Sequence, residues 1–157
     1  MELEVNGNRH AVSHPDEPLL WALHDELGLN GVHYGCGAGI CGCCTVLADG
    51  QPLRSCQVSA RDAAGRSLTT LEGLAALAGA TGDELHPVQQ AFLENPLQCG
   101  WCLPGHVMTA VGLLARTPDP SPEQIAAEAG RNLCRCGGYT AVRENVARAA
   151  RIAREGS

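Results

Sequence analysis

The chain has 157 residues, a formal net charge of −6, an apolar fraction of 45% and an aromatic fraction of only 3%. This length suits one large domain or two small ones, and small domains with marginal cores commonly gain stability from disulfides or metals. Every basic residue is an arginine and the arginines form no basic stripe, so the sequence argues against a nucleic-acid partner.

The N-terminal residues and the hydropathy pattern bear on location. Residues 1–5 are acidic and lack the apolar segment of a secretory signal, and no apolar stretch is long enough to span a membrane. We therefore expect a cytoplasmic protein. Thiols stay reduced in that compartment, so the nine cysteines are expected to bind metal rather than to form disulfides.

The first half of the chain predicts short strands separated by tight turns. Leu3 and Val5 alternate with acidic residues, and Asn6-Gly7 is a strong hairpin turn that leads into a return strand over residues 9–12. Further strands are expected over residues 45–48, 53–58 and 67–71, with another hairpin turn at Asp49-Gly50.

One helix and one long loop interrupt these strands. Pro18 predicts the first turn of a helix with leucines on one face, and Gly28 predicts its end. Residues 31–42 form a glycine-rich loop. Several short strands wrapped around one helix predict an α+β domain over residues 1–74.

Helical signals dominate the second half, behind a weakly patterned linker at residues 74–82. Four helices are predicted: over residues 86–94, from Pro104 to the prolines at 118–122, after Ser121 as an N-cap, and over residues 140–155. Residues 75–157 are therefore predicted to form an all-α domain.

Eight of the nine cysteines fall into two sets of four. The first set is Cys36, Cys41, Cys44 and Cys56, and its C-x4-C-x2-C spacing with a distant fourth cysteine is the plant-type two-iron ferredoxin arrangement. The glycines among these cysteines let backbone N–H groups approach the sulfurs of an anionic cluster. A structural zinc site is the alternative, although zinc sites more often show two C-x2-C pairs.

Cys43 is the ninth cysteine and lies between two members of the first set. Adjacent Cys43 and Cys44 cannot easily both reach the same metal core. Because Cys44 keeps the x2 spacing from Cys41, we interpret Cys43 as a thiol that is not a ligand.

The second set is Cys99, Cys102, Cys134 and Cys136, spaced C-x2-C and C-x-C. Each pair precedes a predicted helix, where the dipole and the free N–H groups favour an anionic ligand. Spacing alone leaves zinc and an iron–sulfur cluster as equal alternatives for this set. The six histidines share no spacing, so they are not expected to be ligands. Two metal centres in so small a chain indicate electron transfer.

Three stretches of sequence resemble one known family. They are residues 35–46 (GCGAGICGCCTV), 98–105 (QCGWCLPG) and 132–139 (NLCRCGGY). In order and spacing they are similar to the small iron–sulfur subunit of molybdenum hydroxylases. That family includes xanthine dehydrogenase, aldehyde oxidoreductase, aerobic carbon monoxide dehydrogenase and the isoquinoline and nicotinate oxidoreductases. The resemblance covers nearly the whole chain.

The resemblance implies a plant-type ferredoxin domain of β-grasp fold over residues 1–74 and a four-helix domain over residues 75–157, each with one 2Fe-2S cluster. It implies that a separate large subunit holds the molybdopterin cofactor and the substrate site, so this chain has no catalytic residue. Electrons would pass from the molybdopterin through the helical-domain cluster and the ferredoxin-domain cluster to a flavin subunit, to a cytochrome or to another acceptor. By match to the family, Gln98 and Cys136 would lie against the pterin.

Some positions depart from the family's usual pattern. Leu103 and Gly137 stand where threonine is common, and His106 where methionine is common; none of the three is a cluster ligand. Trp101 and Tyr139 flank cysteines and are expected to shield a cluster from water. Two alternatives stay open: a freestanding two-cluster electron carrier, and a zinc-stabilised interaction module that would be colourless and redox-silent.

Overall fold

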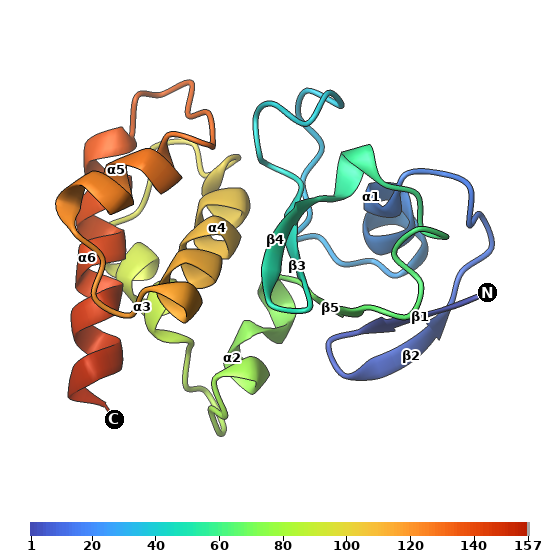
Figure 1. Ribbon diagram of the computed structural model, residues 1–157, viewed down its shortest axis with the longest axis horizontal. Helices are drawn as coiled ribbons and strands as arrows, with labels where there is room; N and C mark the ends of the chain where they lie inside the picture. Colours follow the sequence, from blue (N-terminus) through green and yellow to red (C-terminus); the bar gives the residue numbers. More distant parts are fainter. Residues whose placement is uncertain (157) are drawn as a thin grey trace.

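The computed structural model describes residues 1–156; Ser157, the last residue of the predicted helical domain, lies outside the described residues. A sheet half and a helical half lie side by side (Figure 1). The sheet half contains β1 (Glu2–Val5), β2 (Asn8–Ala11), α1 (Leu19–Trp21), the π-helix Ala22–Glu26, β3 (Thr45–Ala48), β4 (Gln51–Arg54), the 3-10 helix Ser55–Gln57 and β5 (Ser67–Thr69). The 3-10 helix Leu71–Gly73 and α2 (Leu74–Leu77) lead into α3 (Pro87–Glu94), α4 (Leu103–Arg116), α5 (Pro122–Ala129) and α6 (Tyr139–Glu155).

The five strands form one mixed sheet in the order β2-β1-β5-β3-β4. The β1–β2 and β3–β4 pairs are antiparallel hairpins, and β1 runs parallel to β5. Asn6 and Gly7 both adopt positive φ, 52° and 78°, as the predicted hairpin turn requires. Leu3 and Val5 are buried, as their alternation with acids predicts. The sheet half is therefore α+β, as predicted.

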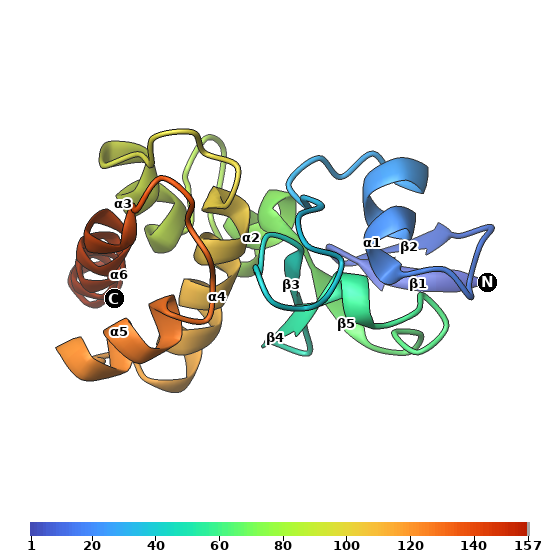
Figure 2. The same ribbon diagram turned by 90° about the horizontal axis from the view of Figure 1, so that it is seen from above.

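β3 is buried on both of its faces, and this joins the two halves. Val46 and Ala48 pack in the core of the sheet half, whereas Leu47 packs in the core of the helical half. Successive side chains of a strand point to opposite faces, so one strand can serve two cores. Figure 2 shows α4 between the sheet and the helices α3, α5 and α6.

Four predictions for the first 82 residues are corrected in type or bounds. The helix after Pro18 continues beyond Trp21 as a π-helix, which ends before Gly28 at φ 67°. The strand expected over residues 53–58 is β4, which ends at Arg54, because residues 55–57 turn into a 3-10 helix. The strand expected over residues 67–71 ends at Thr69, and the linker expected over residues 74–82 begins with the short helix α2.

The helical half contains the four predicted helices. Ser121 caps α5 as predicted: its Oγ accepts a hydrogen bond from the N–H of Gln124 at 3.3 Å, and the Gln124 side chain accepts one from the N–H of Ser121. A second capping box, which was not predicted, starts α3: His86 Nδ1 accepts a hydrogen bond from the N–H of Val88 at 3.1 Å. Across residues 1–156, none of the helices combines the length and the apolar character that crossing a membrane takes.

Candidate metal centres

The first cysteine set lies where the long loop enters β3 and where β4 ends. Cys36 and Cys41 belong to the loop, Cys44 immediately precedes β3, and Cys56 lies in the 3-10 helix 55–57. This turn is fixed beside Cys44, because the Ser55 hydroxyl donates to the Cys44 carbonyl at 2.7 Å and the Ser55 N–H does so at 3.3 Å. The departure from a regular strand at residues 55–57 therefore brings the fourth cysteine to the first three.

Backbone N–H groups converge on the sulfur of Cys36. The N–H groups of Ala38, Ile40 and Cys41 each donate to Cys36 Sγ at 3.3 Å, and the Cys36 N–H donates to Cys41 Sγ at 3.3 Å. These donors, with the N–H of Cys41 first, lower the pKa of the Cys36 thiol to about 6. The loop thus stabilises a thiolate, the form of cysteine that binds metal.

The loop leaves no room for a side chain at residue 35. A Cβ built on Gly35 would lie 2.6 Å from Cys41 Sγ and 3.4 Å from Cys43 Sγ. Such a short contact to sulfur would force either the loop or the cysteine to move. The glycine at this position is therefore required by the close approach of the backbone to the sulfurs.

Cys43 and Cys44 point into different cores although they are adjacent. Cys44 packs in the core of the sheet half and hydrogen-bonds to Cys56, and burial raises its pKa to about 11. Cys43 packs in the core of the helical half, where burial raises its pKa to about 12; it also hydrogen-bonds to Cys41. Only Cys44 therefore meets the fourth member of the first set.

The second cysteine set is assembled from two connections of the helical half. Cys102 is the N-cap of α4, and Cys134 and Cys136 precede α6, whose N-cap is Gly138. Cys99 hydrogen-bonds to Cys136, and Cys102 hydrogen-bonds to Cys134. Each pair therefore contains one cysteine from the connection before α4 and one from the connection before α6.

The two sulfur pairs of the second set differ in environment. Burial raises the pKa of Cys102 to about 12, whereas the N–H of Trp101 is the first cause that lowers the pKa of exposed Cys99. Gly138 N–H donates to Cys134 Sγ at 3.3 Å, and Cys134 N–H donates to the Tyr139 hydroxyl at 2.9 Å. The Tyr139 hydroxyl thus holds the backbone of Cys134 in place.

The arrangement of the sulfurs suits two irons per set. A two-iron cluster takes two cysteine sulfurs on each iron, whereas one zinc ion takes four ligands around a single point. The thiols of the two sets meet in pairs, Cys44 with Cys56 in the first set, and Cys99 with Cys136 and Cys102 with Cys134 in the second.

A buried polar network ties the Cys134 segment to the first set. The N–H of Leu133 donates to the Cys41 carbonyl at 2.8 Å. The neighbouring Asn132 donates to the Gly42 carbonyl at 3.3 Å and accepts from Thr109 at 3.0 Å and from Arg54 at 3.2 Å. These residues were not predicted, because partners far apart in the chain leave no local signal in the sequence.

The two residues expected to face a molybdopterin, Gln98 and Cys136, are both exposed. Trp101 is 56% exposed, so in this chain it covers the second set only in part. His106, in contrast, is 1% exposed and neither ring nitrogen has a hydrogen-bond partner. Burial lowers the pKa of His106 to about 4, and the charge of Arg54 adds to this effect.

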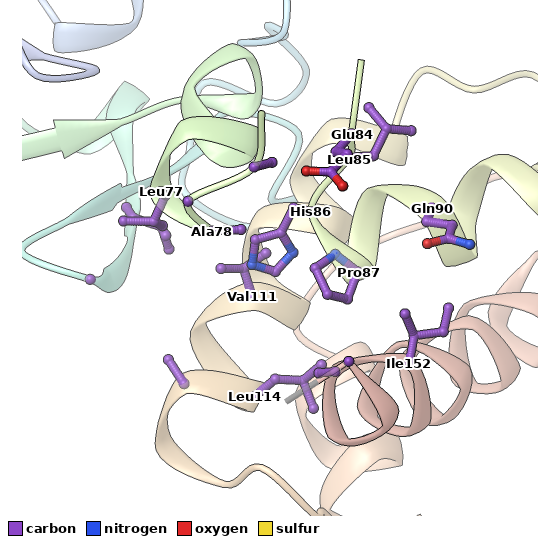
Figure 3. Close-up of a pocket in the computed structure, with 17 residues that line it drawn as sticks. Leu77, Ala78, Glu84, Leu85, His86, Pro87, Gln90, Val111, Leu114 and Ile152 are labelled. Atoms are coloured by element: carbon purple, nitrogen blue, oxygen red, sulfur yellow. The ribbon is translucent and has the colours of Figure 1, made fainter. Parts of the chain in front are cut away.

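A cavity of about 830 Å³ in the helical half has no cysteine in its lining. Figure 3 shows it between α2, α3, α4 and the end of α6, with His86 and Pro87 on one side and Leu114 and Ile152 on the other. Its walls are mainly apolar and hold no cysteine. The cavity is therefore separate from the sulfur chemistry.

Two domain families match the chain. A 2Fe-2S iron-sulfur cluster binding domain matches residues 3–72, and a 2Fe-2S binding domain matches residues 70–147. Among curated proteins, the chain is 50% identical to one subunit of the nicotinate dehydrogenase of Pseudomonas putida, over 99% of this chain and 97% of that protein. It is 40% identical to the alpha subunit of isoquinoline 1-oxidoreductase of Brevundimonas diminuta, over 98% and 99%.

Solved structures are similar along the whole chain. Quinoline 2-oxidoreductase from Pseudomonas putida 86 has a chain that superposes with a TM-score of 0.87 at 37% identity, with 99% of this chain and 96% of that chain covered. Aldehyde oxidoreductase from Desulfovibrio gigas gives a TM-score of 0.87 at 35% identity, and this chain spans 18% of its length. These matches confirm the predicted fold, a plant-type ferredoxin domain of β-grasp type followed by a helical cluster-binding domain.

Proposed function

The chain belongs to the family of small iron–sulfur subunits of molybdenum hydroxylases, and we propose that each of its cysteine sets holds one 2Fe-2S cluster. The chain is an electron-transfer subunit of an oxidoreductase that works with a large catalytic partner. Its ligands are Cys36, Cys41, Cys44 and Cys56 in the first set and Cys99, Cys102, Cys134 and Cys136 in the second. When bound, each cluster accepts and releases one electron at a time.

The ligand assignment is supported by which thiols meet. In the first set, Cys36 and Cys41 share hydrogen bonds, and Cys44 contacts Cys56. Two pairs supply two sulfurs to each of two irons. We propose that Cys43 is not a ligand, because its side chain packs in the opposite core from Cys44.

One hydrogen bond carries the electron-transfer proposal. The N–H of Leu133, the residue before Cys134, donates to the carbonyl of Cys41 at 2.8 Å. A ligand position of the first set is thus connected to a ligand position of the second set through one short hydrogen bond and a few covalent bonds. We propose that this contact is the bridge between the two centres.

The direction of transfer is proposed from exposure and from the family. Gln98 and Cys136 are exposed beside the second set, and we propose that they lie against the molybdopterin that the partner holds. The three N–H groups on Cys36 Sγ favour added negative charge at the first set. Electrons then pass from the second set to the first and on to a flavin subunit, to a cytochrome or to another acceptor.

We retain the predicted domain boundary, residues 1–74 and 75–157, as a proposal. Its support is that the two matched domain families meet at residues 70–72 and that the molecule has two hydrophobic cores. Leu74 packs in the helical core, so the boundary lies within a shared segment. A cytoplasmic location is also proposed, because none of the nine cysteines is paired in a disulfide.

Metal analysis of the purified chain tests the proposal. The chain is purified anaerobically with whatever co-purifies, and iron, sulfide, zinc and molybdenum are measured with the visible spectrum. We expect a brown protein with about four irons and four sulfides, two of each per set, and molybdenum in the same peak. Full clusters in a stable monomer without molybdenum would favour the freestanding carrier. A colourless, zinc-loaded protein would leave the interaction module instead.

A further inference from the structure

A second contact joins the two cysteine sets, on the outer face of the molecule. His33, three residues before Cys36, stacks on Trp101, the residue before Cys102; the ring centroids are 4.4 Å apart and the planes meet at 21°. His33 Nδ1 lies 2.7 Å from the Trp101 carbonyl oxygen. Since that oxygen can only accept, Nδ1 carries the proton and donates.

The contact is reciprocal. The indole Nε1–H of Trp101 donates to the carbonyl of Tyr34 at 3.0 Å, in the opposite direction across the same pair of segments. Two hydrogen bonds and one ring stack thus join residues 33–34 to residue 101. We call this group, His33, Tyr34 and Trp101, the aromatic clamp.

The clamp supplies the hydrogen bonds between the Cys99–Cys102 connection and the sheet half, and it adds to the close packing of Gly105 on the Gly42 carbonyl at the start of α4. Among residues 1–156, the hydrogen bonds that run from residues 95–102 to the sheet half all involve Trp101. The Cys134–Cys136 connection has a separate anchor, the buried network around Asn132 and Leu133. Each half of the second set therefore has its own hydrogen bonds to the sheet half.

The clamp is poorly placed to contribute much to stability. Trp101 is 56% exposed, so the ring buries little apolar surface, and hydrogen bonds near solvent have a modest net effect. A tryptophan is nevertheless a rigid side chain that fixes a geometry at low entropic cost. The contact is rigid and exposed and lies near two proposed ligand cysteines. We therefore expect it to fix the relative position of these cysteines rather than to contribute much to folding stability.

We propose that His33 and Trp101 are positioning residues that hold the Cys99–Cys102 half of the second centre at a fixed distance from the first, and so set the electronic coupling between the two. The inference rests on the proposed function, since it requires a cluster in each set. Sites that transfer groups or electrons depend on supporting residues that keep their geometry within fractions of an ångström. The clamp is such a support, and it acts through Cys102 and Cys36 without being a ligand.

The test is made on the full chain with both clusters reduced by dithionite. Wild type is compared with Trp101→Ala, Trp101→Phe and His33→Phe, and the readouts are the magnetic interaction between the two reduced clusters in EPR and the rate at which a pulsed electron redistributes between them. Each lost hydrogen bond lowers the ratio of clamped to released molecules by roughly two- to tenfold. We expect Trp101→Ala to lose the resolved interaction and to slow redistribution, and the two phenylalanine variants to lie between it and wild type.

Trp21→Phe is the matched control. Trp21 stacks on Tyr34 with ring centroids 5.3 Å apart, but this contact lies within the sheet half alone. It should therefore change neither the magnetic interaction nor the rate. Iron and sulfide content should stay at the wild-type value in all variants, because none of these residues is a ligand.

The experiment distinguishes failure of the positioning proposal from failure of the proposed function. Wild-type interaction and rate in all three clamp variants, with full cluster content, would overturn the positioning role. If Trp101→Ala loses its clusters, Trp101→Phe and His33→Phe decide the question by the same readouts. Absence of two EPR-active clusters from wild type would instead overturn the proposed function itself.

Discussion

The two cysteine sites support their sulfurs in different ways. At the first site, a glycine-rich loop directs three N–H groups at one exposed sulfur, that of Cys36. At the second site the N–H donors are spread over the sulfurs: Gly138 donates to Cys134 Sγ, the Trp101 N–H to Cys99 and the Cys99 N–H to Cys136. Each site also has buried cysteines, Cys44 at the first and Cys102 and Cys134 at the second. Hydrogen bonds to sulfur favour added negative charge on a cluster. The concentration of three donors on one sulfur at the first site supports the proposal that this site receives the electron that the second site releases.

The sites also differ in how they form. The first set spans residues 36–56 and is completed within one loop and one hairpin. The second set needs two connections, after α3 and after α5, to be brought together by helix packing. Damage to the first site should therefore stay local, whereas the second site depends on the fold of the whole helical half.

The largest expected effect comes from exchanging one of two adjacent cysteines. Cys44→Ser should remove the first cluster, halving iron and sulfide and abolishing one EPR signal, because Cys44 meets Cys56. Cys43→Ser is the matched control and should retain both clusters, because Cys43 packs on the other side. Loss of the first cluster in Cys43→Ser with retention in Cys44→Ser would reverse the ligand assignment.

The next largest difference between the two sites is expected when a glycine beside each site is replaced by alanine. A Cβ at Gly35 would lie 2.6 Å from Cys41 Sγ, so Gly35→Ala should destabilise the first site by about 3 kcal/mol and lower its cluster occupancy. Gly100 has φ 78° and open space around its Cβ, so Gly100→Ala costs only backbone strain, about 1 kcal/mol. Thermal unfolding with iron analysis measures both variants; equal losses would show that steric fit at Gly35 is unimportant.

Acid should weaken the helical half through His106. Its pKa in the folded chain is about 4, below the usual value near 6.5, so the unfolded chain binds the proton first as pH falls. This histidine's contribution to stability is fully present above pH 6.5 and declines toward pH 4, by about 2 kcal/mol at pH 5. His106→Met should remove that decline in denaturant unfolding between pH 7 and 5. If the free energy of unfolding fell equally with pH in wild type and in His106→Met, the proposed effect of His106 would be contradicted.

The smallest effect concerns one donor to a sulfur. Gln57 Nε2 donates to Cys56 Sγ at 3.4 Å and to the Gly37 carbonyl at 2.9 Å. Gln57→Leu should make the potential of the first cluster more negative by roughly 20–40 mV, since a net hydrogen bond contributes about 0.5–1 kcal/mol. The second cluster serves as the internal control in the same EPR titration. An equal shift of both potentials would mean that the effect is not local.

Sequence alone predicts the local features well. The turn at Asn6-Gly7, the cap at Ser121 and the helix starts beside the cysteines follow from signals within a few residues. The glycines of the first loop also follow from one local requirement, the approach of backbone to sulfur. These predictions succeed because sterics and hydrogen bonding of neighbouring residues decide them.

Sequence does not predict the contacts that join distant segments. The strand expected to run to residue 58 gives way to a 3-10 helix because Ser55 bonds to Cys44, eleven residues earlier. The Arg54–Asn132 and His33–Trp101 contacts join residues 78 and 68 positions apart. Which thiols meet is a matter of tertiary structure. The x2 spacing already favours Cys44 over Cys43, and the packing of the two side chains in different cores supports that proposal.

An EPR-monitored potentiometric titration of the purified chain decides the direction of electron flow between the two sites. We predict two one-electron signals per chain, with the first-set signal, identified by its loss in Cys44→Ser, appearing at the less negative potential. Electrons would then move spontaneously from the second site to the first. A single signal, or a first-set signal at the more negative potential, would contradict the proposed route.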